Sequence, residues 1–277
     1  MEKRRMCPHC RAFVTTDDKV CPYCDTPIGA RAIDQREPDG LIGGLLPSAR
    51  FITMLILIIN SGLWVATILV SMNGGNQNAI SDIDDRTLFA FGAKYNAAIF
   101  FGHQYWRLVT AGFLHSGLTH FLMNTWVLFD LSASVEQIFE TSRTVVIYFV
   151  ATVTGFLASA WWSDSLSVGA SAGIYGLIGA IVVFGMRHRS ALGDMIKTHY
   201  TRWAVYGLLI GMLPFFRIDN AAHIGGFIGG FATAWLAGEP RPTQPREKIW
   251  NALAVICAVL TGLSFLEMAL SFGGPIS

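Results

Sequence analysis

The sequence predicts an all-α polytopic membrane protein, because it is poor in charge, rich in long apolar runs and asymmetric in the placement of its basic residues. Charged residues make up only 14% of the 277-residue chain and hydrophobic residues 52%, whereas soluble domains usually carry about 25% charged residues. The mean hydropathy is +0.45. So little polar surface does not cover a soluble core, and we expect lipid to surround most of the chain. The net charge of +1 gives no indication of a nucleic-acid partner.

Seven apolar runs approach or reach the length of about 20 residues that a helix needs to cross roughly 30 Å of bilayer hydrocarbon. They cover residues 51–72, 110–135, 145–162, 169–186, 200–216, 221–236 and 250–272. A charged, cysteine-rich stretch precedes the first run, so we expect an internal start-transfer helix and no cleavable signal peptide. Between the first two runs, Phe89, Phe91, Phe100 and Phe101 indicate amphipathic segments at the membrane interface.

The basic residues give these spans an orientation, since cytoplasmic loops carry an excess of Lys and Arg. With the N-terminus in the cytoplasm, 16 of the 20 Lys and Arg residues fall on the inside. The outside then holds only Arg86, Lys94, Arg107 and Arg217. The sequence therefore predicts a cytoplasmic N-terminus, an odd number of spans and a C-terminus outside.

The N-terminal segment carries four of the five cysteines, in the motifs CPHC and CPYC. Cys7, Cys10, Cys21 and Cys24 form two CxxC pairs, and four such thiolates are typical of a closed, structural Zn²⁺ site. Redox or disulfide cysteines are the alternative, which a cytoplasmic placement disfavours. We therefore predict a zinc-ribbon-like module over residues 1–30, because so short a segment cannot build a core without a staple.

The remaining chain divides by composition. A polar linker containing Gly and Pro is expected over residues 31–49, and a six-helix core over residues 50–237. Residues 238–277 are expected to add a cytoplasmic loop and a seventh transmembrane helix. Cys257 lies alone in that last span, where a buried free thiol is expected.

Polar side chains near the outer ends of three spans are the candidates for function, because such groups are costly inside a membrane. The second span carries His115, His120 and Asn124, the fourth carries Ser171 and the sixth carries His223. All three spans run inward from the outside. Since Ser171 and His223 each follow an outer loop by a few residues, both are expected on the order of 5–10 Å below the surface.

Stripes of small residues predict that the fourth and sixth spans pack closely, since such stripes let helix backbones approach in lipid. The stripes are Gly169, Gly173, Gly176 and Ala180 in one span and Ala222, Gly226, Gly230 and Ala234 in the other. In the alternative interpretation, the Gly-Ala-Ser-Ala-Gly segment is only packing surface and His223 is a satisfied core histidine. That alternative does not explain why both polar groups lie at one depth beside a glycine stripe.

A serine and a histidine at one depth suit nucleophilic acyl transfer. His223 can take the proton of the Ser171 hydroxyl and return it to the leaving amine. The amide of Ser171, at a helix start, can donate to the oxyanion, and so can the side chains of His120 and Asn124, which lie one helical turn apart.

Two further residues bear on the orientation of the histidine. Tyr175 lies one turn after Ser171 and can stack on the ring of His223. No acidic third member is evident at that depth, since Asp219 belongs to the loop, so we interpret the pair as a dyad.

Together these residues resemble the rhomboid family of intramembrane serine proteases. The matching pieces are Trp106-Arg107, His115, His120-x-x-x-Asn124, Gly169-x-Ser171-x-Gly173 with Tyr175, and Ala222-His223-x-x-Gly226-x-x-x-Gly230. Each motif alone is weak, but the set is specific in its order over about residues 51–236. The resemblance implies a six-helix core whose water-filled active site opens to the outside. In this chain, the seventh helix and the zinc module lie beyond that core.

The resemblance also implies roles. It makes Ser171 the nucleophile, His223 the base, and His120, Asn124 and the Ser171 amide the oxyanion donors, with no cofactor needed for catalysis. The substrates would be single-span membrane proteins, cut within the lipid bilayer near their outer ends. Glu136 resembles an acidic family residue with a structural role. We expect the plasma (inner) membrane of a bacterium as the location.

Alternatives to the protease interpretation remain, and the sequence departs from the family's motif at one position. Many family members have Gly directly after the serine, whereas this chain has Ala172, whose added methyl group could crowd the oxyanion pocket slightly. A rhomboid-like protein that binds membrane clients without cutting them is the main rival, although such relatives usually lack the serine or the histidine. A transporter would tend to show internal repeats, and a zinc protease would need a motif such as HExxH in the membrane; the sequence contains neither. Substrate entry is expected to need movement of the fifth span, with residues 212–216 as a gate.

Overall fold

The chain forms two compact units, Met1–Ser48 and Ala49–Ser277. The computed structural model describes residues 4–7, 9–15, 18–26, 50–188, 190–213, 218–240 and 245–272. The predicted linker over residues 31–49 lies outside the described residues. The division of the second unit into a core over residues 50–237 and an appended part over residues 238–277 stays a prediction.

The N-terminal unit is a small antiparallel hairpin with a core made largely of cysteine. Strand β1, Arg4–Met6, pairs with strand β2, Phe13–Thr15. Among the described residues of this unit, Cys7, Val14 and Cys21 form the buried cluster. One valine and two thiols bury too little apolar surface to hold a fold of this size without a further staple.

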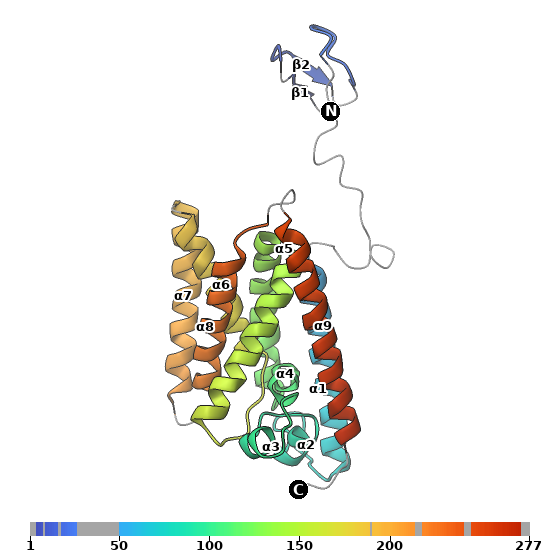
Figure 1. Ribbon diagram of the computed structural model, residues 1–277, viewed down its shortest axis with the longest axis vertical. Helices are drawn as coiled ribbons and strands as arrows, with labels where there is room; N and C mark the ends of the chain where they lie inside the picture. Colours follow the sequence, from blue (N-terminus) through green and yellow to red (C-terminus); the bar gives the residue numbers. More distant parts are fainter. Residues whose placement is uncertain are drawn as a thin grey trace. The chain divides into compact units, whose positions relative to one another are not determined.

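The regular structure of the second unit is helical in the residues described, apart from an isolated antiparallel bridge between Lys94 and Ser167 (Figure 1). Its helices are α1 Phe51–Asn73, α2 Asp85–Ala90, α3 Asn96–Phe100, α4 Arg107–Thr110, α5 Leu118–Trp162, α6 Ser171–Arg187, α7 Ala191–Gly211, α8 Asn220–Ala237 and α9 Arg246–Ser271. The 45-residue α5 is two helices joined at Glu140, whose backbone is not helical (φ 61°, ψ 167°). A helix therefore lies at each of the seven expected spans, and the all-α polytopic fold is confirmed.

Length and composition single out three described helices that can cross a membrane, namely α1, α5 and α9. The 17-residue α6 is a shorter apolar helix. The short α2 and α3 include Phe89 and Phe100, where the sequence predicts amphipathic segments. These short helices gather at one end of the bundle (Figure 1).

The predicted boundaries of two spans are wrong, and the errors come from equating helices with apolar runs. The second span begins at Leu118 and not at residue 110, because residues 107–113 form α4 and a 3₁₀ turn, Ala111–Phe113. The fifth span is α7, Ala191–Gly211, and not residues 200–216. Its first turns include Asp194 and Lys197, which form an ion pair of 2.8 Å on the helix surface. Helix α7 thus extends through polar residues that an apolar window leaves out.

Glu136 of α5 anchors the start of α1. Its buried carboxylate accepts hydrogen bonds from the backbone N–H groups of Ile52 (3.2 Å) and Thr53 (3.4 Å) and from the Thr53 hydroxyl (3.1 Å). Thr141 donates a further bond of 2.9 Å. The first N–H groups of a helix have no acceptor within it, and the positive end of the helix dipole favours an anion there. Glu136 therefore caps α1 from a neighbouring helix, as the structural role expected for it requires.

Helix α9 packs against α4 and α5 and is fixed at both ends. At its start, buried Arg143 of α5 donates to both carboxylate oxygens of Glu247, at 2.6 and 2.9 Å. At its far end, Phe272 meets Phe91 edge to face, with ring centroids 5.1 Å apart. The seventh span is thus a packed part of the helical unit.

The backbones of α5, α6 and α8 touch in the middle of this unit. A Cβ atom built on Gly230 of α8 would lie 2.3 Å from the Cα of Gly176 in α6. One built on Gly226 would lie 2.2 Å from the carbonyl oxygen of Ala172, and one on Gly155 of α5 would lie 2.6 Å from that of Ala222. The close packing predicted from the small-residue stripes is present.

We predict that Gly230→Ala destabilises the protein by about 1–3 kcal/mol, because the added methyl group has no space and the two helices must separate. The matched control is Gly262→Ala in α9, since no heavy atom lies within 4 Å of a Cβ built there. The control should be neutral or stabilising by up to about 1 kcal/mol. Thermal unfolding of the purified variants in detergent measures both. Equal melting temperatures for the two variants would contradict the close contact.

We also predict that Glu247→Gln lowers stability by about 3 kcal/mol, because it leaves the guanidinium of Arg143 buried without its anionic partner. Asp194→Asn is the control, since it removes one charge from an ion pair whose aspartate side chain is 64% exposed. Exposed pairs contribute about 0–1 kcal/mol. The melting temperatures of the two variants should differ clearly, and a loss in Asp194→Asn as large as that in Glu247→Gln would refute this account of α9.

Candidate active site

Ser171 and His223 come from two different helices and meet near the end of the bundle that carries α3 and α4 (Figure 1). Ser171 is the first residue of α6, and His223 lies in the first turn of α8. The Ser171 Oγ and His223 Nε2 atoms are 2.8 Å apart, which is hydrogen-bond distance. Only 6% of His223 is exposed. An imidazole nitrogen in this position can accept the proton of the serine hydroxyl.

Lys94 positions the loop that leads into α6. Its backbone pairs with Ser167 in both directions, at 2.9 and 3.1 Å. Its Nζ donates to the carbonyl oxygens of Ser163 (2.5 Å) and Ser165 (2.9 Å). The side chain is fully buried, and this burial lowers the pKa of the ammonium group. A single lysine in a polar loop gives no sequence signal, so Lys94 was not among the predicted site residues.

Arg107 holds the segment between α2 and α4 in the same region. Its guanidinium donates to the carbonyl oxygens of Phe89 (2.7 Å) and Ala93 (3.0 Å) and lies 4.0 Å from the centroid of the Phe89 ring. This side chain is also buried. Arg107 and Lys94 therefore fix the irregular chain on which the placement of Ser171 depends.

The ring of His223 is held by stacking. The Tyr175 ring lies parallel to it, with centroids 4.1 Å apart and an interplanar angle of 11°, as the spacing of Tyr175 from Ser171 led us to expect. Within the part of the chain that the structure describes, the Nδ1 atom of His223 has no hydrogen-bond partner. The carboxylate of Asp219 accepts instead from the Ala222 amide (3.0 Å) and the Ser159 hydroxyl. Asp219, the nearest acid in sequence, thus caps α8. The imidazole of His223 is held in place by the Tyr175 ring and not by this carboxylate.

His120 lies beside the serine, with its Nε2 edge toward Gly169. The backbone N–H of Ser116 donates to His120 Nδ1 at 3.5 Å. Because a backbone N–H can only donate, the neutral ring carries its proton on Nε2. A Cβ atom on Gly169 (φ +141°) would lie 2.8 Å from His120 Nε2 and 3.4 Å from Ser171 Oγ. Glycine therefore keeps open the space between a ring donor and the serine oxygen.

Asn124 lies one helical turn beyond His120 on α5. Its Nδ2 is buried, and no partner for it occurs among the described residues. The amide of Gly169, two residues before α6, is not a free donor, because it already donates to the carbonyl of Ala111 at 2.9 Å. Ser171 begins the helix, where amide groups lack an intrahelical acceptor. The Ser171 N–H thus adds a donor at the serine itself, and the oxyanion role of Asn124 stays a prediction.

His115 does not meet the serine in the same way. It is fully buried and packs edge to face against His120 and Phe121, with centroids 5.2 and 5.4 Å away. Neither ring nitrogen has a partner among the described residues. His115 thus packs against the ring of His120 and restricts its position.

The family model described as Rhomboid domain matches residues 102–240, which make up half of the chain and include Ser171, His223, His120, Asn124 and Tyr175. The chain belongs to the rhomboid family. Rhomboid protease GluP of Bacillus subtilis (strain 168) is 35% identical over 188 residues, covering 68% of this chain. Rhomboid-like protease 3 of Toxoplasma gondii is 34% identical over 186 residues, covering 65% of this chain and 70% of that protein.

The relatives differ in extent and in activity. The chain spans only about a third of the length of GluP, since the similarity covers 36% of that protein. Inactive RHOMBOID-like protein 8 of Arabidopsis thaliana is 35% identical over 129 residues, which cover 46% of this chain and 36% of that protein. Rhomboid relatives of this chain therefore include proteins named as proteases and one named as inactive.

Ala172, the departure from the rhomboid pattern, has its methyl group in the helix interface. It is fully buried in a cluster with Ile99, Phe156 and Ala222. A Cβ atom on Gly155 of α5 would lie 2.8 Å from the Ala172 Cβ. The methyl group of Ala172 thus faces Gly155 of α5.

The four N-terminal cysteines form a separate cluster in their own unit. All four sulfur atoms lie within 4.8 Å of one another, with Cys7 to Cys24 at 3.7 Å and Cys10 to Cys21 at 3.6 Å. These distances exceed a disulfide bond and match the edge of roughly 3.8 Å in a tetrahedron with Zn–S bonds of about 2.3 Å.

The two CxxC turns of this cluster have the same backbone. Cys7 accepts from the amide of Arg11 (3.0 Å) and donates to Ala12 (2.9 Å), and Cys21 bonds in the same way with Asp25 and Thr26 (both 2.9 Å). Hydrogen bonding by Thr26 lowers the pKa of the Cys24 thiol to about 5, whereas burial and the neighbouring thiols raise the pKa of Cys10 to about 12 against a lowering hydrogen bond at Ala12. The donor set therefore fits a structural Zn²⁺ ion with no open coordination position.

Proposed function

We propose that this chain is a serine endopeptidase that cuts transmembrane substrates near their outer ends, with Ser171 as nucleophile and His223 as general base. The observation that supports this most directly is the 2.8 Å distance between Ser171 Oγ and His223 Nε2. The stacked Tyr175 and the ring donor of His120 beside Gly169 complete the groups that acyl transfer needs.

In the acylation step, the Ser171 Oγ bonds to the carbonyl carbon of the scissile peptide while His223 Nε2 takes the hydroxyl proton. The carbonyl oxygen becomes an oxyanion, which His120 Nε2–H, Asn124 and the Ser171 amide stabilise. His223 then gives its proton to the peptide nitrogen as the C–N bond breaks. The C-terminal fragment leaves as an amine, and the N-terminal fragment remains as an ester on Ser171.

In the deacylation step, His223 takes a proton from water as the water oxygen bonds to the ester carbon. The bond from that carbon to Ser171 Oγ breaks, and the proton returns to the serine. The products are a carboxylic acid and the restored dyad. Both steps need His223 protonated on Nδ1 and free on Nε2 at the start, and Tyr175 stacking keeps the ring plane in place without a carboxylate.

The alternative function is binding of membrane clients without cleavage, which is suggested by the similarity to an Arabidopsis relative named as inactive. Two features of this chain favour cleavage. Both the serine and the histidine are present, and they lie within hydrogen-bond distance.

The distribution of charge supports an orientation with the active site toward the outside. Basic residues gather at the helix ends opposite α2 and α3. They include Arg50, Arg143, Arg187, Arg246 and Lys248, and Lys197 lies in the second turn of α7. Under the excess of positive charge on the cytoplasmic side, that end faces the cytoplasm of a bacterial cell. The proposed gate at residues 212–216 lies only partly within the described residues, where Met212 and Leu213 are exposed.

We predict that Ser171→Ala and His223→Ala each lower cleavage by roughly a thousandfold or more, because the two residues act as one unit. The assay uses protein reconstituted in lipid and a single-span substrate with small, helix-weakening residues near its outer end. A fluorophosphonate probe gives a second readout, since it should label wild type at Ser171 and should label His223→Ala far more slowly.

Matched controls are Ser165→Ala and His103→Ala, which remove the same side chains from the exterior loops and should keep wild-type cleavage. Retained cleavage in Ser171→Ala would show that the nucleophile is a different residue. Neither cleavage nor labelling of wild type, against a panel of substrates, would favour the client-binding function.

We further propose that Cys7, Cys10, Cys21 and Cys24 hold one structural Zn²⁺ ion, and predict one zinc per purified chain. Cys21→Ser should reduce the zinc content to background, while Cys257→Ser, which changes the lone thiol of α9, should retain it. Elemental analysis of protein in detergent measures both. Because the site is closed, removing the metal should leave cleavage of a model substrate largely intact. Equal zinc content in Cys21→Ser and wild type would refute the assignment.

A further inference from the structure

A cavity of about 220 Å³ lies between α5, α6 and α7, in the inner direction from the candidate active site. Its lining residues are Trp126, Val127, Asp130, Ile178, His199, Tyr200 and Trp203. A cavity of about 150 Å³ is enough to hold benzene inside a protein. This one therefore has room for the end of a large side chain.

The cavity continues the same helix faces that carry the active site. Ile178 lies seven residues, or two turns, after Ser171 on α6, and Val127 lies three residues after Asn124 on α5. Asp130 lies ten residues after His120, which is roughly 15 Å along the helix. Tyr200 is the tenth residue of the 21-residue α7 and so lies near the middle of that helix.

Asp130 is the polar centre of the cavity. Its carboxylate accepts a hydrogen bond of 3.2 Å from the Tyr200 hydroxyl, across the space between α5 and α7. The side chain is exposed on the protein surface. A carboxylate offers about four lone-pair sites, and this is the one hydrogen bond to Asp130 among the described residues, so most of its acceptor capacity is left for a ligand. An acid at this depth in a membrane is costly and calls for a function.

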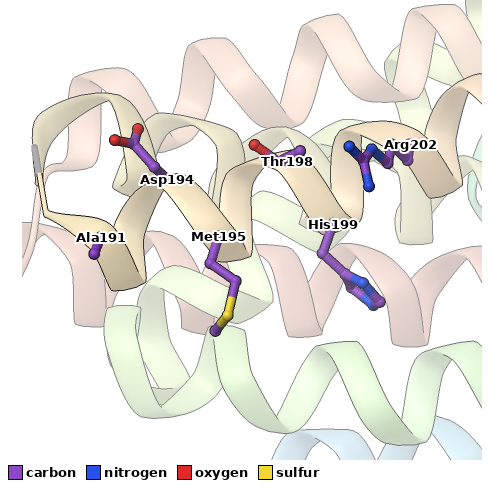
Figure 2. A pocket seen from close by; sticks show the side chains of 6 residues that line it. All are labelled: Ala191, Asp194, Met195, Thr198, His199 and Arg202. Atoms are coloured by element: carbon purple, nitrogen blue, oxygen red, sulfur yellow. The ribbon is translucent and has the colours of Figure 1, made fainter.

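Aromatic rings form the walls around this carboxylate. Trp126 and Trp203 meet edge to face across α5 and α7, with centroids 5.9 Å apart. His199 lies 5.1 Å from the Tyr200 ring and points from α7 toward the neighbouring α5 helix (Figure 2). Figure 2 also shows that the larger cavity beside the inner half of α7 is lined from that helix alone. A carboxylate among tryptophan faces suits a cation, which both attract.

We propose that Asp130, with the Trp126 and Trp203 rings, forms a subsite for a Lys or Arg side chain in the inner half of a substrate's transmembrane segment. The inference rests on the proposed function, because a substrate helix with its cleaved bond at Ser171 would extend inward along this face. The basic residue would lie about ten residues beyond the cleaved bond if that part of the substrate is helical. Basic side chains are rare in membrane spans, so this contact would select a small class of substrates.

The other explanation is a latch, in which Asp130 and Tyr200 only hold α5 and α7 together until a substrate enters. The two explanations differ in what they predict for substrates. A latch affects every substrate by the same factor, whereas a subsite distinguishes a basic side chain from an apolar one.

The test is binding of single-span peptides to the Ser171→Ala protein in lipid vesicles, measured by energy transfer between dyes on peptide and protein. The peptides carry Lys or Leu at one position, moved from six to fourteen residues beyond the intended cleavage site. We expect Lys to bind at least about tenfold more tightly than Leu near position ten, as one charge-assisted bond would give. Asp130→Asn should abolish this preference, and Tyr200→Phe should retain it. The control Asp194→Asn, the same change at the inner end of α7, should also retain it.

Three results would overturn the subsite. They are no preference for Lys at any position, a preference that persists in Asp130→Asn, and equal changes for Lys and Leu peptides in both Asp130→Asn and Tyr200→Phe. The last result would identify a latch. Cleavage of the Leu peptide by the protein with Ser171 intact is measured separately. A failure of the protease proposal therefore appears there, and a failure of the subsite appears in the binding data.

Discussion

The direct contact of α6 and α8 at Gly176 and Gly230 is the constraint on which the arrangement of the site depends. A Cβ atom on Gly230 would lie 2.3 Å from the Gly176 Cα, so the two backbones meet with no side chain between them. This contact fixes how far one helix is shifted along the other. Ser171 lies five residues before Gly176 and His223 seven before Gly230, and their 2.8 Å contact follows from that register. A shift of one residue would move one partner by about 1.5 Å, which is enough to break the hydrogen bond.

Tyr175 extends this constraint to α7. Its ring stacks on His223, while its hydroxyl donates to the Ala204 carbonyl of α7 at 3.0 Å. The hydroxyl occupies the place of a side chain at Gly207, where a Cβ atom would lie 2.2 Å away. If α7 moves to admit a substrate, it takes the acceptor of this bond with it. In the proposed protease, the position of α7 and the orientation of the base are therefore coupled through one side chain.

The features that the sequence predicts correctly are those that depend on local chemistry. The seven helical segments follow from apolar length, and the cysteine cluster follows from two CxxC pairs. The meeting of Ser171 and His223 required one further step, since topology gives their depth and the glycine stripes give their proximity. The start of α7 was missed because polar residues continue a helix as well as apolar ones do. Lys94 was missed because its partners lie about seventy residues further along the chain, and the contact of Asp130 with Tyr200 was missed for the same reason.

A comparison with two other acids of the helical unit shows why Asp130 calls for a ligand. Glu136 accepts four hydrogen bonds and caps α1, and Asp219 accepts two and caps α8, so helix structure accounts for both. Asp130 accepts one, of 3.2 Å, and caps no helix. Such a bond contributes about 1 kcal/mol, whereas an aspartate at the centre of a membrane helix costs about 2.5–3.5 kcal/mol. The difference between this cost and the free energy contributed by the hydrogen bond is left uncompensated in the free protein. A basic side chain that arrives with a substrate would offset it, and a substrate lacking that side chain would not.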